Sequence, residues 1–229
     1  MKKKLLVGLA LTCFTALLSA QVATADTFQG TTTGIFVNPI GGTNTGVGTA
    51  NFETGTGTPT TLDFLGNPAI DVNSDISFSF GTLTYFNGAT TAGTTASAVD
   101  LSVVLNLTAP TGITENFIYN LTFNMTPNVG TPAQQADYLY LPTVQPPTSF
   151  SYGGTDYTLA FLGFGSMDNN GFVTTLDQFH VYEYASASAQ LFGKFTESTA
   201  PVPEPTTMLL MGTGLAGLAA ARRRKAKKN

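Results

Sequence analysis

The chain of 229 residues contains no tryptophan, one cysteine and one histidine. The cysteine, Cys13, lies in an apolar N-terminal stretch, so the rest of the chain has neither a disulfide nor thiol chemistry. A zinc site needs several cysteine or histidine ligands, and the lone His180 does not supply them. His180 stands between Phe179 and Val181 on an expected strand, which favours a structural role for its ring.

Basic residues are scarce between residues 26 and 200. This segment holds one lysine, Lys194, no arginine and thirteen acidic residues, which gives a net charge of −12. The whole chain has a formal charge of only −4, because nine of its ten basic residues lie outside this segment. Nucleic-acid binding depends on Lys and Arg that contact phosphates, so the composition excludes that function for the segment. Its acidity suits an extracellular protein that stays soluble or that meets cations.

Catalytic motifs are also lacking in this segment. It has no Gly-x-Ser-x-Gly sequence, and a Ser-His-Asp triad would have to use His180. Pairs of carboxylates hydrolyse glycosidic bonds in many enzymes. The acidic residues here are scattered beside expected turns or on strand faces, where solvated carboxylates are the usual case: Glu53, Asp63, Asp71, Asp75, Asp100, Glu115, Asp137, Asp156 and Glu183. We therefore expect a non-catalytic protein, with a glycan-binding or glycan-hydrolysing protein as the alternative.

The N-terminus has the three parts of a secretory signal peptide. Three lysines at positions 2–4 precede the apolar residues 5–18, and the small residues Ala23 and Ala25 form a cleavage site. Cleavage after Ala25 leaves Asp26 as the first residue of the exported protein. We divide the chain into a signal peptide (1–25), an extracellular segment of single-domain size (26–200) and a C-terminal sorting and anchor segment (201–229).

The C-terminal segment combines a proline motif, an apolar run and a basic cluster. Pro203 and Pro205 flank Glu204 and bar a helix across the motif, so the tripeptide is expected to be open to a processing enzyme. Residues 206–221 carry no charge and would span about 24 Å as a helix, short of the hydrocarbon core of about 30 Å. The basic cluster then holds this end at the cytoplasmic face: Arg222, Arg223, Arg224, Lys225, Lys227 and Lys228.

This order of Pro-Glu-Pro, short apolar helix and basic terminus resembles the PEP-CTERM sorting signal of Gram-negative bacteria. In that family an exosortase reads the signal, cleaves near the motif and releases the protein towards a polysaccharide-rich surface layer. The resemblance implies export through the secretion machinery, a pause in the inner membrane through a transmembrane helix at residues 206–221, and arrival at the cell surface or extracellular matrix. The resemblance also implies two partners, an exosortase and extracellular polysaccharide. A permanent tail anchor is the alternative.

The central segment shows strand periodicity and no helical periodicity. Apolar residues alternate from Val99 to Leu107 and from Phe117 to Met125, the mark of strands buried on one face. Alternation through Ile76, Phe78 and Phe80 slips at Gly81, which indicates a β-bulge. Further strands are expected at residues 157–164, 172–176, 179–184 and 190–195. About ten short strands indicate an all-β fold, an antiparallel β-sandwich of jelly-roll type.

A proline-rich connection at residues 127–147 is expected to wrap around the sheet rather than to join two domains. Tyr138 and Tyr140 lie in it, and Tyr152 follows it. Exposed aromatic residues on loops often mark binding surfaces, so these three tyrosines are the best candidates for a surface on which a ligand stacks.

The body also resembles a second family. The segments Gly-Val-Gly-Thr-Ala-Asn-Phe (46–52), Thr-Leu-Asp-Phe (61–64) and Phe-Gly-Thr-Leu-Thr-Tyr-Phe-Asn-Gly (80–88) are similar to the choice-of-anchor K domain over about residues 35–195. Members of that family are β-rich surface domains found with different anchoring tails. The resemblance therefore implies a surface domain, and it implies no catalytic residues.

One sharp chemical hypothesis is a calcium loop. Five residues fall at the first, third, fifth, sixth and twelfth positions of the calcium-loop spacing: Ser166, Asp168, Asn170, Gly171 and Asp177. In such loops oxygen ligands alternate and a glycine makes the sharp turn. A plain hairpin turn at Asn170-Gly171 explains the same residues, so both interpretations stay open.

Overall fold

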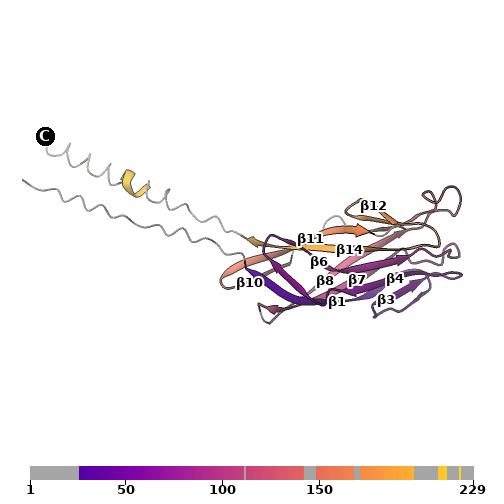
Figure 1. The fold of residues 1–229 in the computed structure, drawn as a ribbon, viewed down its shortest axis with the longest axis horizontal. Helices are drawn as coiled ribbons and strands as arrows, with labels where there is room; N and C mark the ends of the chain where they lie inside the picture. Colours follow the sequence, from indigo (N-terminus) through magenta and orange to yellow (C-terminus); the bar gives the residue numbers. More distant parts are fainter. Residues whose placement is uncertain are drawn as a thin grey trace, which may run out of the picture.

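The computed structural model describes residues 26–110, 112–141, 148–167, 171–198, 211–215 and 222. Of these residues 64% lie in strands and 4% in helix. The strands form two antiparallel sheets, which Figure 1 shows as two layers of one elongated domain. The expectation of an all-β sandwich is therefore confirmed.

Each sheet has seven strands among the described residues. The first consists, in spatial order, of β12 (Gly171–Thr175), β13 (Gln178–Val181), β9 (Asp137–Tyr140), β8 (Ile113–Asn124), β7 (Ala98–Ala109), β1 (Thr27–Ile40) and β5 (Ile70–Asn73). The second consists of β10 (Thr148–Tyr152), β11 (Thr155–Met167), β14 (Ser186–Ser198), β6 (Ser77–Phe86), β4 (Thr60–Gly66), β3 (Asn51–Thr54) and β2 (Asn44–Thr45). Every strand pairing is antiparallel.

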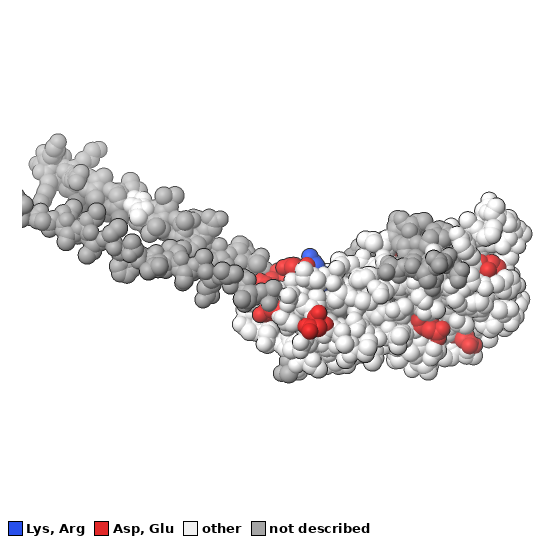
Figure 2. Space-filling model, in the orientation of Figure 1, with Lys and Arg blue, Asp and Glu red and all other residues white. Residues whose placement is uncertain are grey.

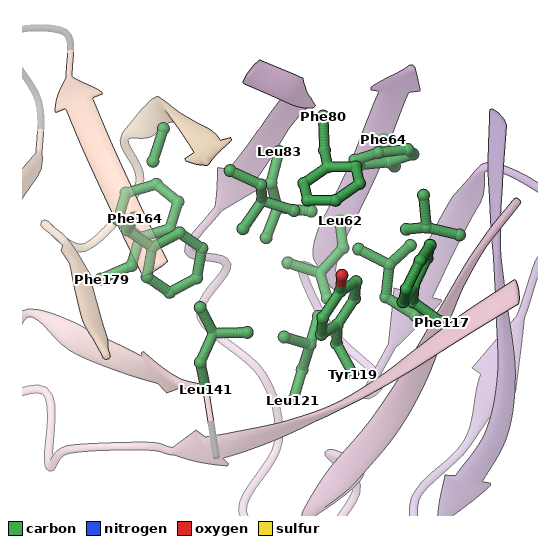
Figure 3. Packing of buried hydrophobic residues seen from close by; sticks show 14 of the residues in the cluster. Leu62, Phe64, Phe80, Leu83, Phe117, Tyr119, Leu121, Leu141, Phe164 and Phe179 are labelled. Atoms are coloured by element: carbon green, nitrogen blue, oxygen red, sulfur yellow. The ribbon is translucent and has the colours of Figure 1, made fainter. Parts of the chain in front are cut away.

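The core lies between the two sheets. On β7 and β8 the predicted alternation holds, and these side chains are all buried: Val99, Leu101, Val103, Leu105, Leu107, Phe117, Tyr119, Leu121 and Phe123. Figure 3 shows Phe64 and Phe80 from the second sheet facing Phe117 and Tyr119 from the first. Burying one such side chain stabilises the fold by roughly 1.5–3 kcal/mol. All described residues of the hydrophobic core cluster lie between Phe28 and Phe195.

The bulge expected at Gly81 is present. Leu191 of β14 pairs with Gly81, but the next residue, Phe192, pairs with Ser79, so β6 has one extra residue at this point. A side chain does not fit at Gly81, because a Cβ atom would lie 2.5 Å from the Leu65 carbonyl oxygen. The extra residue reverses the phase of β6, so that Leu83 and Tyr85 continue the buried face that Phe78 and Phe80 begin. Ile76 is an exception: it precedes the strand and is 56% exposed.

Two expectations about the connections are wrong. The proline-rich connection does not merely wrap the sheet, because Asp137–Tyr140 forms β9 between β8 and β13. Asn170-Gly171 does not join a hairpin, since β11 pairs with β10 and β14 in one sheet and β12 pairs with β13 in the other.

The two signal segments fall mainly outside the described residues. Ala23 and Ala25 of the cleavage site lie outside them, as do Pro203, Glu204 and Pro205 of the sorting motif and Arg223, Arg224 and Lys225 of the basic cluster. Within the expected apolar helix, residues 211–215 are helical and exposed, and Arg222 is helical too. No helix in the described part of the chain combines the length and the apolarity needed to cross a bilayer.

Candidate functional site

Four polar side chains gather at one end of the sandwich, and we call them the polar cluster: Tyr85, Asn87, Asp137 and Glu183. Tyr85 belongs to β6 and Asn87 follows that strand. Asp137 opens β9, and Glu183 lies in the turn between β13 and β14. Val181, at the end of β13, pairs with Asp137, so the turn that follows β13 meets the start of β9 here. The cluster thus combines residues that are far apart in the chain.

Asp137 is the most deeply buried carboxylate of the cluster. It is 3% exposed, because position 137 shares the inward face of β9 with Leu139. Its Oδ1 accepts hydrogen bonds from Thr126, from the backbone N at 2.6 Å and from Oγ1 at 3.2 Å. Burial raises the pKa of Asp137, and these two hydrogen bonds oppose the rise. Desolvation is the larger effect, so the fold disfavours the charged form of Asp137.

Asp137 also lines a cleft of about 540 Å³. The cleft lies between the loop before β7, which contributes Thr95 and Ser97, and the loop after β8, which contributes Thr126 and Asn128. Its lining is mixed, since Phe123 and Met125 contribute apolar groups beside these hydroxyls and the amide. The cleft therefore gives solvent and small ligands a route to the buried carboxylate.

Glu183 is the second carboxylate of the cluster. Its Oε1 accepts a hydrogen bond of 3.0 Å from Asn128 Nδ2. Burial raises its pKa, the charge on Asp137 raises it further, and the nearby Asn87 side chain opposes the rise. Asp137 and Glu183 are therefore close enough to repel each other when both are ionised.

Tyr85 and Asn87 are fully buried, and each has an oxygen without a hydrogen-bond partner. Two hydrogen bonds hold Asn87 in place. Its side-chain Nδ2 donates to Val181 O at 3.0 Å, and its backbone carbonyl accepts from Tyr184 N at 2.8 Å. Its Oδ1 accepts nothing, and the Tyr85 hydroxyl is unpartnered too. Burial, followed by the charges on Asp137 and Glu183, raises the pKa of Tyr85. A buried polar atom without a partner costs about 1–3 kcal/mol, so this cluster is suited to binding a ligand.

A second polar surface lies on the outer face of the first sheet. Leu139 points into the core, so its neighbours Tyr138 and Tyr140 point outwards, and both are partly exposed. Their rings stack with centroids 5.8 Å apart and planes 13° apart. We call these two side chains the tyrosine pair. Tyr152 is 43% exposed, but it lies on β10 in the other sheet, so the structure brings together two of the three predicted tyrosines.

His180 supports the tyrosine pair from the neighbouring strand. Its ring centroid lies 3.8 Å from that of Tyr138, and it is 3% exposed. Its Nε2 lies 3.3 Å from Gln178 Oε1. Burial lowers the pKa of His180, so the neutral ring predominates at pH 7. These contacts fit the structural role that the sequence favoured.

The predicted calcium loop lies partly outside the described residues. Asp168 and Asn170 belong to the part that is not described. Ser166 stands near the end of β11, and Asp177 lies in the turn between β12 and β13, where its carbonyl accepts a hydrogen bond of 2.9 Å from Leu141 N. Within the described ranges, no group of three or more His, Cys, Asp and Glu side chains is placed to hold a metal ion. Calcium binding by this loop stays a prediction.

Most of the other acidic side chains are dispersed. Figure 2 shows acidic residues in separate small groups over the face in view. Asp100, for example, accepts hydrogen bonds from Asn38 and Asn120 at 3.1 and 2.8 Å, and Asp75 lies 3.7 Å from Lys194. Asp137 and Glu183 depart from the expected solvated state. For Asp137 the period of two gives the signal, because it places position 137 on the same face as Leu139.

The comparison with known families concerns the C-terminal segment. Residues 201–225 match the sequence model of the PEP-CTERM protein-sorting motif. This motif marks a protein that is exported, processed by an exosortase and placed at the cell surface or outside the cell. The match covers the Pro-Glu-Pro motif, the apolar run and the start of the basic cluster. No curated protein matches the chain.

Proposed function

We propose that residues 26–200 act, after release by an exosortase, as a non-catalytic component of the extracellular polysaccharide matrix. The observation that carries the proposal is the PEP-CTERM motif at residues 201–225. Its resemblance to that sorting signal implies release towards a polysaccharide-rich surface layer. The net charge of −12 on residues 26–200 supports it, because such a domain stays soluble outside the cell. The polysaccharide is the partner of the β-sandwich in this account.

The resemblance of the body to choice-of-anchor K domains supports the same conclusion. Its three segments, residues 46–52, 61–64 and 80–88, fall largely on β3, β4 and β6 or on the turns beside them. These three strands are neighbours in the second sheet. The segments therefore belong to one continuous piece of the fold, as is expected of a surface domain carried by different anchoring tails.

The tyrosine pair is the surface that we assign to the polysaccharide. Both tyrosines are partly exposed, so each offers part of an aromatic ring to the apolar face of a sugar. Thr122 and Asn124 of β8 pair with Tyr140 and Tyr138, and both are exposed, so polar groups flank the rings. A paired strand holds both tyrosines, so little ordering is needed on binding.

Co-sedimentation of residues 26–198 with the exopolysaccharide of the producing bacterium tests this assignment. We expect the unaltered domain to sediment with the polysaccharide, and the double variant Tyr138→Ala, Tyr140→Ala to lose at least tenfold in affinity. Tyr152→Ala is the matched control, since Tyr152 is exposed on the other sheet, and its affinity should not change. Equal binding by all three proteins would contradict the role of the tyrosine pair, and absence of binding by the unaltered domain would contradict the matrix role.

A glycan-hydrolysing enzyme is the second candidate, and one observation favours it. Asp137 and Glu183 interact electrostatically, and Asp137 lines the cleft. Hydrolysis needs two carboxyl groups that flank the bond across a groove, about 5 to 9 Å apart. Asp137 is 3% exposed and its Oδ1 is engaged by Thr126, which disfavours contact with a sugar. Release of reducing sugar by the unaltered domain, abolished in Asp137→Asn, would establish the enzyme and exclude the non-catalytic role.

A further inference from the structure

We propose that the polar cluster binds a calcium ion, with Asp137, Glu183 and Asn87 as its protein ligands. This site is separate from the loop at residues 166–177 that the sequence suggested. Its residues are also distinct from those of the tyrosine pair, so the two sites can be altered separately.

The first argument is the supply of free oxygen atoms. Glu183 Oε2 and Asn87 Oδ1 are buried and accept no hydrogen bond. Asp137 uses Oδ1 for both bonds from Thr126. Two carboxylates and one amide carbonyl are oxygen ligands of the kind that calcium prefers. The cluster contains no sulfur or imidazole ligand, which disfavours zinc and other transition metals.

The second argument is the uncompensated charge. Asp137 and Glu183 lie close enough for their charges to interact, and the buried hydroxyl of Tyr85 feels both. No basic side chain balances them among the residues that the structure describes within the domain: Lys194 is the one lysine there, and it pairs with Asp75 at 3.7 Å. A divalent cation would neutralise both carboxylates and satisfy Asn87 Oδ1 at the same time.

The third argument is access. Calcium takes six to eight oxygen ligands in a flexible arrangement, so three protein ligands leave several positions for water. Asp137 lines the cleft of about 540 Å³, which gives the ion a route to this carboxylate. Magnesium demands a stricter octahedral arrangement, and the cluster, drawn from separate loops, favours the larger ion.

Binding would connect three segments that are far apart in the sequence. Asn87 follows β6, Glu183 lies in the turn before β14, and Asp137 opens β9. Because Tyr138 follows Asp137 directly, an ion at Asp137 also fixes the start of the strand that carries the tyrosine pair. Sites in extracellular modules have dissociation constants of about 0.1–1 mM, which sets the concentration range for a test.

Thermal unfolding of the full chain, purified in detergent, tests the site. After chelation, addition of 10 mM CaCl₂, roughly 10 to 100 times such a dissociation constant, should raise the Tm by about 5 °C, whereas the same concentration of MgCl₂ should change it by less than about 1 °C. Asp137→Asn and Glu183→Gln keep the size of each side chain and remove one charge. Each should abolish most of the calcium-dependent rise.

Two control variants distinguish the polar cluster from calcium binding elsewhere on the chain. Asp100→Asn alters a carboxylate on the outer face of β7 and should keep the full response to calcium. Asp168→Asn removes a ligand of the predicted loop and should also keep it. Terbium, which replaces calcium and luminesces when a nearby tyrosine is excited, provides a readout that does not depend on stability. Emission should be strong in the unaltered chain and lost in Asp137→Asn and Glu183→Gln.

Three results would overturn the proposal. The first is an unaltered chain whose Tm does not respond to calcium. The second is a full response in both Asp137→Asn and Glu183→Gln. The third is a response that disappears in Asp168→Asn alone, which would assign the ion to the loop. None of these outcomes bears on sorting or on polysaccharide binding, so the proposed function is tested separately.

Discussion

The rings of Phe28 and Phe195 stack with their centroids 4.2 Å apart and their planes inclined by 23°. Phe28 lies near the start of the first strand and Phe195 near the end of the last, and both are fully buried. Phe78 extends the stack, with its ring 4.9 Å from that of Phe195. The first and last strands of the domain therefore pack against each other in one aromatic cluster, which joins the two sheets.

Phe195→Ala should therefore destabilise the domain strongly. Removing a fully buried phenylalanine costs about 3–5 kcal/mol, because the lost contacts leave a cavity in the core. Urea unfolding of residues 26–198 measures the change. Ile118→Ala on β8 is the control: Ile118 is 54% exposed, so its replacement should change the free energy of unfolding by no more than about 0.5 kcal/mol. Equal effects of the two variants would contradict the aromatic cluster.

Gly193→Ala tests the close packing of the same strand. A Cβ atom at Gly193 would lie 2.1 Å from Cε2 of Phe80, a core side chain of β6. The variant should lose about 1–3 kcal/mol of stability through overpacking. Phe80→Leu replaces the opposing ring by a smaller side chain and makes room for the added methyl group. The double variant should therefore be more stable than the sum of the two single changes predicts. Additive effects in this double-mutant cycle would show that the two residues do not compete for space.

The strands that line the core were predictable from the sequence, because their period of two is unbroken. Val99 to Leu107 and Phe117 to Phe123 alternate without a gap and became β7 and β8. The slip at Gly81 was predictable as well, since one extra residue must reverse the phase of a strand. The length of β1 was not, because its inward positions include Gly30, Thr32 and Gly34, which carry no apolar signal.

The candidate site was much less predictable. β9 has only four residues and stands among prolines, so its alternation was too short to outweigh the signal for a loop. Asp137 and Glu183 are 46 positions apart and belong to no recognisable motif. The pairing of β13 with β9, which ends at Val181 and Asp137, brings the turn that holds Glu183 towards β9. Long-range strand pairing of this kind cannot be deduced from local patterns.

The stability of the calcium-free protein should depend on Asp137. Its pKa is raised in the folded state, so between its unfolded pKa of about 3.9 and the higher folded value the native state binds more protons. Stability is therefore lost as the pH rises through that range, and Glu183, whose pKa is also raised, acts in the same direction.

Asp137→Asn removes this penalty and keeps an oxygen for the two bonds from Thr126. With a chelator present, the variant should be more stable than the unaltered protein at pH 7 and similar to it at pH 3.5. Urea unfolding at the two pH values measures this difference. A variant that is less stable at pH 7 would show that ionised Asp137 stabilises the apoprotein.

His180 should titrate below its ordinary pKa of about 6.5. Because burial beside Tyr138 lowers the folded pKa, its contribution to stability is present above pH 6.5 and is lost as the pH falls towards the folded value. The chain has one histidine, so proton NMR of the domain shows a single imidazole titration without the need for assignment. A pKa above 6.5 would mean that the folded state favours the charged ring.

Intact-mass analysis of the protein recovered from the cell surface tests the central claim most directly. The account predicts one species that begins at Asp26 and ends close to Pro203-Glu204-Pro205, because export removes the signal peptide and an exosortase cleaves near the motif. Replacing the three motif residues by alanine is the matched control, and that protein should stay in the membrane fraction uncleaved. Surface protein that still carries Arg222 to Asn229 would contradict release and would establish a permanent tail anchor instead.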